Sequence, residues 1–318
     1  MKPITGSFFE FDHHSRYEGK YYNETLWNFT EEQWRAKVRE HKNMGLDTLI
    51  LLCTAIYDEC YYDFDEMPFA KHIACKNVME VFLDESDKLG LDVYLSAGFY
   101  GDWTLPQDNT TQRPLIDKAI RGMKRVNELY GHHKCIKGWY MPDEWEIKGH
   151  FEERFIDYIN EISAVVHSFN PEYKTIIAPY GTNMTTPDDK YAEQLSRMDV
   201  DYIAYQDEVG VEKSTPEQTG AYYKALKEAH DKGGRAKLWA DVETFKFEGQ
   251  VYKSALLSAD WERVKAQMEA VSPYVEKIIV FTCQGLLTEP NSICRAGYPE
   301  LPEKLYTDYM NWLENESK

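Results

Sequence analysis

Two short stretches of the chain combine a strand-like apolar run with carboxylates at its end. The first is Gly138–Glu146, with the sequence GWYMPDEWE, and the second is Leu238–Glu243, LWADVE. We expect Glu144 and Glu243 to be the reacting residues. Asp241 is an alternative to Glu243, because residues two apart lie on the same side of a strand. Breaking a glycosidic bond needs one carboxylic acid to protonate the leaving oxygen and one carboxylate on the other side of the sugar ring. The pair predicts chemistry at a sugar, provided that the fold brings the two strand ends together.

The two acids are expected to have different roles. Glu144 suits a general acid only if its pKa is raised, and we expect the indoles of Trp139 and Trp145 to form the apolar wall that raises it. Glu243 is then the nucleophile or base. The plain alternative for Glu144 is a salt bridge at the rim of the fold.

The elements that must position these acids follow from short apolar runs bounded by turns, which predict eight strands. These runs are Gly6–Phe11, Thr48–Cys53, Val93–Ala97, Gly138–Met141, Thr175–Pro179, Tyr202–Tyr205, Leu238–Asp241 and Ile278–Thr282. Segments with helical spacing lie between them; Thr30–Gln33 reads as a capping box, and Pro114 as a first-turn proline. Strict alternation of strand and helix predicts an α/β fold, a (β/α)8 TIM barrel, as a single domain over residues 1–318. An open doubly wound sheet is the competing layout, but no Gly-x-Gly-x-x-Gly turn follows any strand.

In such a barrel, the carboxyl ends of the strands form the active-site face. Residues just past the predicted strands are rich in acids, amides and aromatic rings, whereas the opposite end is charged and poor in aromatic residues. Aromatic rings cover the apolar face of a sugar, and polar side chains take up its hydroxyls. We expect substrate contacts from Glu10, His13, Tyr100, Trp103, Tyr140, Asp143, Tyr180, Tyr205, Gln206, Asp207, Trp239, Asp241 and Gln284. Tyr205 is also expected to hydrogen-bond the nucleophile if its ring points inward.

The placement of the two glutamates resembles that of clan A glycoside hydrolases. In that clan, the Glu at the end of strand four is the acid/base and the Glu at the end of strand seven is the nucleophile of a retaining mechanism. The segments Gly6–Phe9, Tyr205–Gly210 and Trp239–Phe245 also resemble an uncharacterised glycoside-hydrolase-like barrel family of bacterial glycan-utilisation loci. This resemblance covers nearly the whole chain and implies that Glu144 and Glu243 are the catalytic pair.

The chain departs from the clan pattern at Asp143, where the clan has an Asn before the acid/base. The amide donor to the substrate 2-hydroxyl is therefore missing. Either Asp143 accepts a hydrogen bond from that hydroxyl, or Asp143 is itself the catalytic acid.

The run Asp12-His13-His14 raises the question of a metal. Adjacent histidines on an extended segment diverge, so only one of them is expected to join a site with Glu10 or Asp12. No H-x-x-x-H pair supports such a site, and we expect neither a metal nor another cofactor. Two other classes of function stay open: a metal-assisted sugar isomerase or epimerase, and a carbohydrate-binding barrel without activity.

Charge and cysteine content limit the possible partners of the chain and its possible cellular compartment. With 36 basic and 54 acidic residues, the formal charge of −18 argues against nucleic acid and anionic membranes, because both would repel the chain. No apolar run approaches the roughly 20 residues of a membrane span. The six cysteines show no zinc or C-x-x-C spacing, and the N-terminus lacks the apolar core of a signal peptide. We expect a carbohydrate substrate and the cytoplasm in preference to the periplasm, which would require a removed leader; the oligomeric state stays open.

Overall fold

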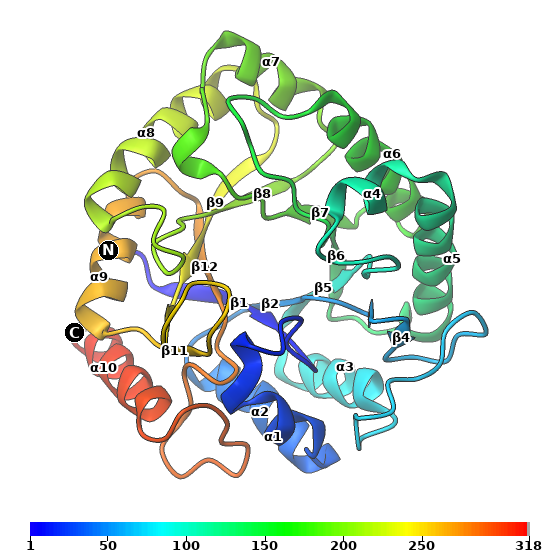
Figure 1. Ribbon diagram of the computed structural model, residues 1–318, viewed down its shortest axis with the longest axis vertical. Coiled ribbons are helices and arrows are strands. Elements are labelled where there is room, and N and C mark those ends of the chain that lie inside the picture. Colours follow the sequence, from blue (N-terminus) through cyan, green and yellow to red (C-terminus); the bar gives the residue numbers. More distant parts are fainter. Residues whose placement is uncertain (317–318) are drawn as a thin grey trace.

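The computed structural model describes residues 1–316, and its centre is a closed barrel of parallel strands inside a ring of helices (Figure 1). The order around the barrel is β1-β12-β9-β8-β7-β6-β5-β2, so consecutive barrel strands pair with each other and the last one closes on the first. The predicted (β/α)8 TIM barrel is thus confirmed. Continuous parallel pairing without an edge satisfies the backbone of every barrel strand.

The barrel strands lie where the apolar runs predict them. They are β1 (Ile4–Phe9), β2 (Thr48–Leu51), β5 (Asp92–Ser96), β6 (Ile136–Tyr140), β7 (Lys174–Ile177), β8 (Tyr202–Gln206), β9 (Lys237–Glu243) and β12 (Lys277–Phe281). Two short antiparallel hairpins were not predicted. They pair β3 (Ala55–Ile56) with β4 (Glu59–Cys60), and β10 (Phe245–Phe247) with β11 (Leu256–Ser258).

Helices follow the strands and form the outer layer. They are α1 (Asn23–Trp27), α2 (Glu31–Asn43), α3 (Val78–Leu89), α4 (Pro106–Thr111), α5 (Arg113–Tyr130), α6 (Glu153–Phe169), α7 (Asp189–Arg197), α8 (Pro216–Gly233), α9 (Trp261–Val271) and α10 (Leu301–Glu316), with short 3-10 turns η1 (Glu18–Tyr21) and η2 (Thr182–Met184). The predicted capping box starts α2: Gln33 N donates to Thr30 Oγ1 at 3.3 Å, and Thr30 N donates to Gln33 Oε1 at 2.9 Å. Pro114 lies in the first turn of α5, as predicted.

The barrel interior is filled by alternate residues of each strand, while the residues between them face the helices. Interior side chains are Phe8, Ile50, Leu52, Tyr94, Tyr140, Ile176, Ala178, Ala204, Trp239 and Ile279. Trp239 was expected to contact substrate, but it is buried in this interior and stacks on Tyr202, with ring centroids 4.2 Å apart. That assignment is corrected: Trp239 is a core residue.

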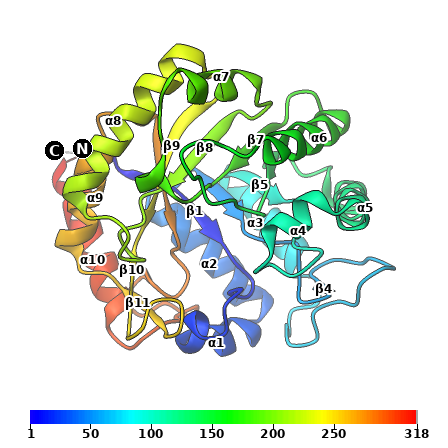
Figure 2. The ribbon, with the colours of Figure 1, turned by 45° about the horizontal axis from the view of Figure 1, so that its top comes forward.

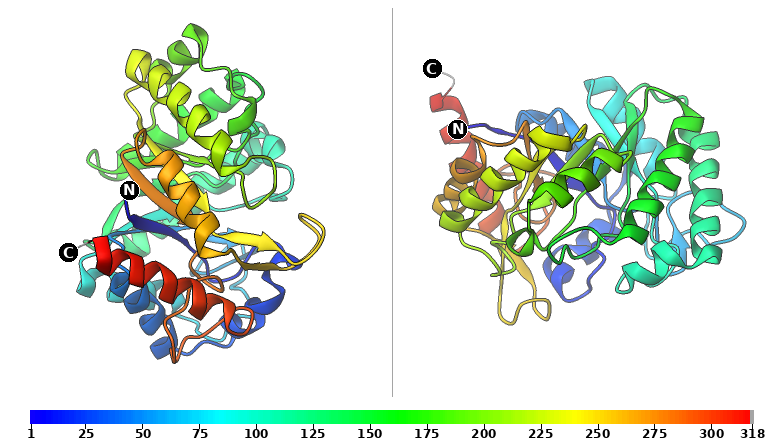
Figure 3. Two further views of the ribbon diagram at one scale, coloured as in Figure 1. Left: turned by 90° about the vertical axis from the view of Figure 1, so that its left-hand side faces the viewer. Right: turned by 90° about the horizontal axis from the view of Figure 1, so that it is seen from above.

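The loops at the carboxyl end of the barrel contact one another. The β10–β11 hairpin projects beyond the barrel (Figure 3) and lies beside the segment that contains η1 (Figure 2). Glu248 of the hairpin loop accepts hydrogen bonds from Lys20 Nζ at 2.9 Å and Tyr21 OH at 2.5 Å.

At the other end of the barrel, Tyr309 OH of α10 donates to Ile4 O of β1 at 3.2 Å. Within residues 1–316, no helix combines the length and apolar character that crossing a membrane requires.

Candidate active site

A cavity of about 660 Å³ opens at the carboxyl end of the barrel. Its acidic wall contains Glu18, Glu144, Glu208, Asp241 and Glu243. Aromatic and imidazole rings also line it, contributed by His14, Tyr17, Phe99, Trp103, Tyr180, Phe245, Tyr252 and Phe281. The size suits a small number of sugar units, and the mixture of rings and carboxylates suits hydroxyl-rich molecules.

Glu144 is half-buried in the cavity wall, four residues beyond the inward-facing Tyr140 at the end of β6. Tyr140 OH donates to its Oε1, and Gln206 Nε2 donates to its Oε2 at 2.5 Å. Burial raises the pKa of Glu144 to about 8; the two hydrogen bonds oppose this rise, and the charge of Asp143 adds to it. Glu144 therefore holds a proton at neutral pH, as a general acid must.

The apolar wall expected from the two neighbouring indoles is not what surrounds Glu144. Trp139 faces the helix layer, where its ring lies 5.6 Å from that of Phe169. Trp145 stacks on Phe155 and donates its Nε1 to Thr110. The pKa of Glu144 is raised by its burial in the cavity wall rather than by contact with these rings.

Glu243 is the last residue of β9 and lies in the same cavity. Its Oε2 accepts a hydrogen bond from Val211 N at 2.9 Å. Burial raises its pKa well above the usual value, and the charge of Asp207 raises it further. Asp207 itself lies behind the wall, where Gln267 Nε2 donates to it at 2.6 Å and Glu243 N donates at 3.2 Å. Glu243 thus accepts a single hydrogen bond from the described residues, whereas the neighbouring, fully buried Asp207 accepts several.

Asp241 precedes Glu243 by two residues on β9, so its side chain points to the same side of the strand. It lies near both Glu144 and Glu243. It is 2 % exposed, lines the cavity, and its Oδ1 has no hydrogen-bond partner among the described residues. Burial raises its pKa, followed by the charges of Glu144 and then Glu243. Both glutamates therefore lie close enough to Asp241 to act on it, and the two predicted strand ends do meet in one cavity.

Glu208 and Lys213 also line the cavity, although neither was predicted to bind substrate. Glu208 is fully buried, and neither of its carboxylate oxygens accepts a hydrogen bond from the described residues. Its contact is an ion pair with Lys213 Nζ at 3.3 Å, and Lys213 also lies over the ring of Tyr180 at 5.0 Å. The backbone of Glu208 is left-handed, with φ 55°. Non-glycine residues in this conformation concentrate at functional sites.

Other predicted contacts reach the cavity. Trp103, Tyr180, Gln206 and Asp241 line it as expected. Tyr140 is an inward core residue that reaches the site only through its hydrogen bond to Glu144. Glu10, His13 and Gln284 lie fully buried behind the wall.

Three predicted contacts face away from the cavity and are corrected. Tyr205 contacts Tyr191 at 2.9 Å and His230 at 3.1 Å in the helix layer, so it does not reach Glu243. Tyr100 contacts Tyr62 OH at 2.6 Å. Asp143 accepts a hydrogen bond from Asn109 Nδ2 at 2.7 Å.

Asp143 has a structural partner that explains its position. It is 4 % exposed and does not line the cavity. Burial raises its pKa to about 7, and the hydrogen bond from Asn109 opposes this rise. Neither alternative considered for Asp143 fits, because a side chain directed at Asn109 can neither bind a 2-hydroxyl in the cavity nor protonate a leaving group there.

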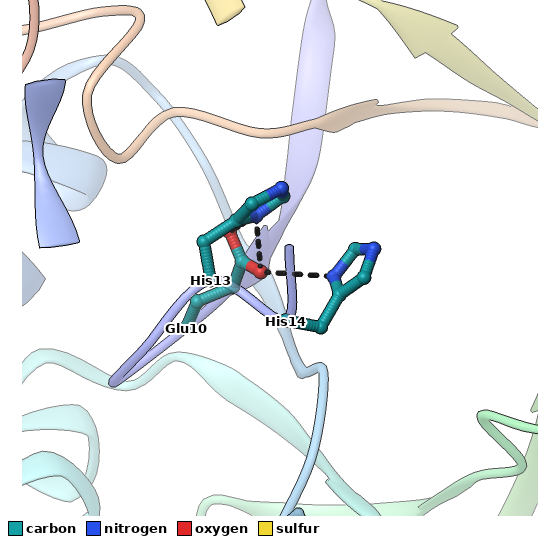
Figure 4. Close-up of side chains that lie close together, drawn as sticks. All are labelled: Glu10, His13 and His14. Atoms are coloured by element: carbon teal, nitrogen blue, oxygen red, sulfur yellow. Dashed lines mark hydrogen bonds and ion pairs between the residues drawn. The ribbon is translucent and has the colours of Figure 1, made fainter. Parts of the chain in front are cut away.

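Within residues 1–316, three groups of side chains have the composition of metal ligands. Glu10, His13 and His14 lie close together (Figure 4), and His14 lines the cavity. The other two, Glu80 with His132 and His133, and Asp87 with His133 and Cys135, precede β6 at the opposite end of the barrel. Asp12 belongs to none of them: it binds Arg16, Trp27 and His72 instead.

Comparison with known proteins identifies the family and the fold of this chain. A family model described as a domain of unknown function, DUF4434, matches residues 4–294. The sequence matches no curated protein. Among solved structures, a protein from Bacteroides thetaiotaomicron VPI-5482 named as a candidate alpha-L-fucosidase is 18% identical with a TM-score of 0.77, over 98% of this chain and 93% of that one.

Two glycoside hydrolases are more distant. The endo-1,4-beta-mannanase of Rhizomucor miehei is 11% identical with a TM-score of 0.61, over 98% of this chain and 95% of its own. A GH5_18 protein from Streptomyces cattleya, solved with Manβ1-4GlcNAc, is 14% identical with a TM-score of 0.59, over 98% of this chain and 81% of its own. The chain therefore has the barrel fold of glycoside hydrolases.

Proposed function

We propose that this chain, which belongs to the DUF4434 family, is a glycoside hydrolase that cleaves an oligosaccharide or glycoconjugate with retention of configuration. The observation that carries the proposal is that Glu144 and Glu243 line one cavity, with Asp241 near both. A proton-bearing acid and a weakly stabilised carboxylate beside one sugar-sized space are the parts that glycoside hydrolysis requires.

Glu144 is assigned as the acid/base. Its raised pKa keeps a proton available, which it gives to the glycosidic oxygen as the bond to the anomeric carbon breaks. The resulting carboxylate then takes a proton from the water that releases the sugar. Tyr140 and Gln206 hold both of its oxygens in place and stabilise the ionised form between these steps.

Glu243 is assigned as the nucleophile that forms a bond to the anomeric carbon. In the free protein its carboxyl group accepts one backbone N–H and lies near Asp207, and its raised pKa means that the ionised form, which attacks, is weakly stabilised. Such a carboxylate is stabilised most when positive charge develops on the sugar ring. Its attraction to the sugar is therefore stronger in the transition state than in the ground state. Water then cleaves the glycosyl–Glu243 bond and regenerates the carboxylate.

Sugar hydroxyls are expected to contact the remaining polar wall. Glu208 and Asp241 carry buried oxygens without donors, which hydroxyl groups of a bound sugar would supply. Trp103 and Tyr180 offer ring faces at the same wall.

The test is a panel of aryl glycosides and natural oligosaccharides with wild-type protein, Glu144→Gln and Glu243→Gln. Each variant is expected to lose roughly 10²–10⁴-fold in kcat on the substrate that the wild type cleaves. Glu146→Gln is the matched control, because Glu146 pairs with Lys148 at 3.1 Å outside the cavity. NMR of the first-formed product should show the anomer of the substrate. Full turnover by both Gln variants, or sugar binding without turnover by the wild type, would contradict the proposal.

A further inference from the structure

The two adjacent histidines at the end of β1 converge on one carboxylate instead of diverging (Figure 4). His13 Nδ1 lies 2.9 Å from Glu10 Oε1, and His14 Nδ1 lies 3.8 Å from the same oxygen. One ligand atom from each of the three residues lies within 4.8 Å of the others. The ring centroids of His13 and His14 are 4.4 Å apart, with an interplanar angle of 44°. Both Nδ1 atoms point toward Glu10 (Figure 4).

The ring nitrogen Nδ1 of His14 lies 3.8 Å from Glu10 Oε1, which is beyond hydrogen-bond distance. Its Nδ1 is buried and has no hydrogen-bond partner among the described residues. The side chain as a whole is 20% exposed and lines the cavity. A buried nitrogen without a donor or acceptor costs free energy unless something binds it. His14 therefore connects the cluster to the cavity wall.

The surroundings hold His13 in the orientation that a ligand needs. Its Nε2 lies 3.2 Å from Glu18 Oε2, on the side of the ring opposite Glu10. Its backbone N donates to Asn23 Oδ1 at 2.8 Å. Metal-binding histidines commonly donate their second ring N–H to a carboxylate, which fixes the tautomer and the ring plane. Glu18 is placed to accept that hydrogen bond.

We propose that Glu10, His13 Nδ1 and His14 Nδ1 bind a divalent transition-metal ion at the cavity wall. Two imidazoles and one carboxylate are a ligand set that zinc and related ions use when a coordination position is kept open. The ion takes the place of the proton that His13 and Glu10 share, and a sugar hydroxyl or water in the cavity completes its coordination. This site goes beyond the hydrolase proposal and does not rest on it.

The test uses the full chain, freed of metal with a chelator and then titrated with Zn²⁺ by calorimetry and thermal unfolding. Wild-type protein is expected to bind Zn²⁺ at this site and to unfold at a higher temperature when it is bound. Co²⁺ in its place should give visible ligand-field absorption bands. The variants are His14→Ala, which keeps the Glu10–His13 pair, and Glu18→Gln, which loses the orienting carboxylate.

Glu18→Gln is expected to weaken Zn²⁺ binding about 10–100-fold, and His14→Ala to weaken it more. His132→Ala is the matched control: it removes one ligand of the cluster at the other end of the barrel, so its Zn²⁺ affinity at the cavity site should equal that of the wild type. Unchanged affinity in a folded His14→Ala variant, or loss of binding only in His132→Ala, would overturn the proposal. Circular dichroism establishes that each variant is folded.

Discussion

Gln206 donates a hydrogen bond from Nε2 to Oε2 of Glu144 at 2.5 Å, and thereby connects the ends of β8 and β6. The same amide donates to Ala178 O at 2.9 Å, just beyond β7. Three barrel strands thus converge on the acid. Because the amide stabilises the ionised carboxyl, it lowers a pKa that burial raises.

Replacing Gln206 tests this relationship. Gln206→Met removes the donor, so the pKa of Glu144 should rise above its value of about 8. We expect the alkaline limb of kcat/KM to move to higher pH, while kcat falls because the carboxyl loses its fixed orientation. The measurement is the pH profile on the substrate found in the glycoside panel. Gln107→Met, at an exposed position of α4, is the control and should keep the wild-type profile.

Glu144 should also make stability depend on pH. Its folded pKa of about 8 exceeds the ordinary 4.5, so between these values the folded state binds more protons than the unfolded state. The free energy of unfolding contributed by this group therefore falls as pH rises from about 5 to 8.

Glu144→Gln has no charge to bury, so we expect its stability relative to wild type to increase over the same range. Urea unfolding at pH 5.5 and 8 for both proteins measures the difference. A difference that is constant with pH, or equal to that of Glu146→Gln, would contradict this prediction.

Glu208 should determine how tightly substrate is held. Glu208→Gln keeps the shape but replaces one acceptor oxygen by a donor, so sugar hydroxyls lose a charge-assisted hydrogen bond. We expect KM to rise by roughly tenfold, which corresponds to a loss of about 1.4 kcal/mol in binding free energy, with a smaller change in kcat. Steady-state kinetics and sugar titrations measure it. Glu212→Gln, an exposed neighbour that also has a left-handed backbone, controls for changes in the loop.

A buried ion pair should make α2 sensitive to single substitutions. Lys37 and Glu40 form an ion pair with exposures of 0% and 2%, and Glu40 Oε1 also accepts from Glu289 N at 2.6 Å. Lys37→Met leaves a buried carboxylate without its cation, which costs about 3–5 kcal/mol. Adding Glu40→Gln removes the charge and keeps the acceptor, so the double variant should recover part of the loss. Chemical unfolding of both proteins, with Lys42→Met as the control, measures this recovery.

The fold could be predicted because each barrel strand is a short apolar run between helical segments with clear boundaries. The hairpins β3–β4 and β10–β11 could not, because strands of two or three residues carry too little pattern. The buried Lys37–Glu40 pair was equally hidden, since two charged residues in a helix normally indicate its solvent side.

The site could be predicted as far as strand order and residue type allow. That Glu144 and Glu243 line one cavity could be predicted because parallel strands end at one face. Tyr205 and Asp143 were predicted to contact substrate because the alternation of side chains along a strand was not applied. Ala204 and Tyr140 point into the barrel, so the residues one and three positions beyond them point outward. Alternation counted from those positions would have identified Gln206 and Glu144 as inward and excluded their neighbours.

Three features could not be found in this way. Tyr100 has inward parity, but Gly98 has a left-handed φ of 84° and interrupts the extended chain, so Phe99 lines the cavity instead. Glu208 follows β8 in a left-handed turn at a non-glycine residue, which sequence rarely indicates. Convergence of His13 and His14 likewise depends on the loop that follows β1, not on strand geometry.

The pairing of β1 with β12 joins Ile4 to Ile278, nearly the full length of the chain. During synthesis from the N-terminus, β1 therefore leaves the ribosome long before its partner exists. Until Lys277–Phe281 emerges, one side of β1 and one side of β9 are open strand edges that can pair with another nascent chain. Ring closure makes this protein dependent on delayed, long-range assembly, so chaperone supply and translation speed should govern its yield in cells.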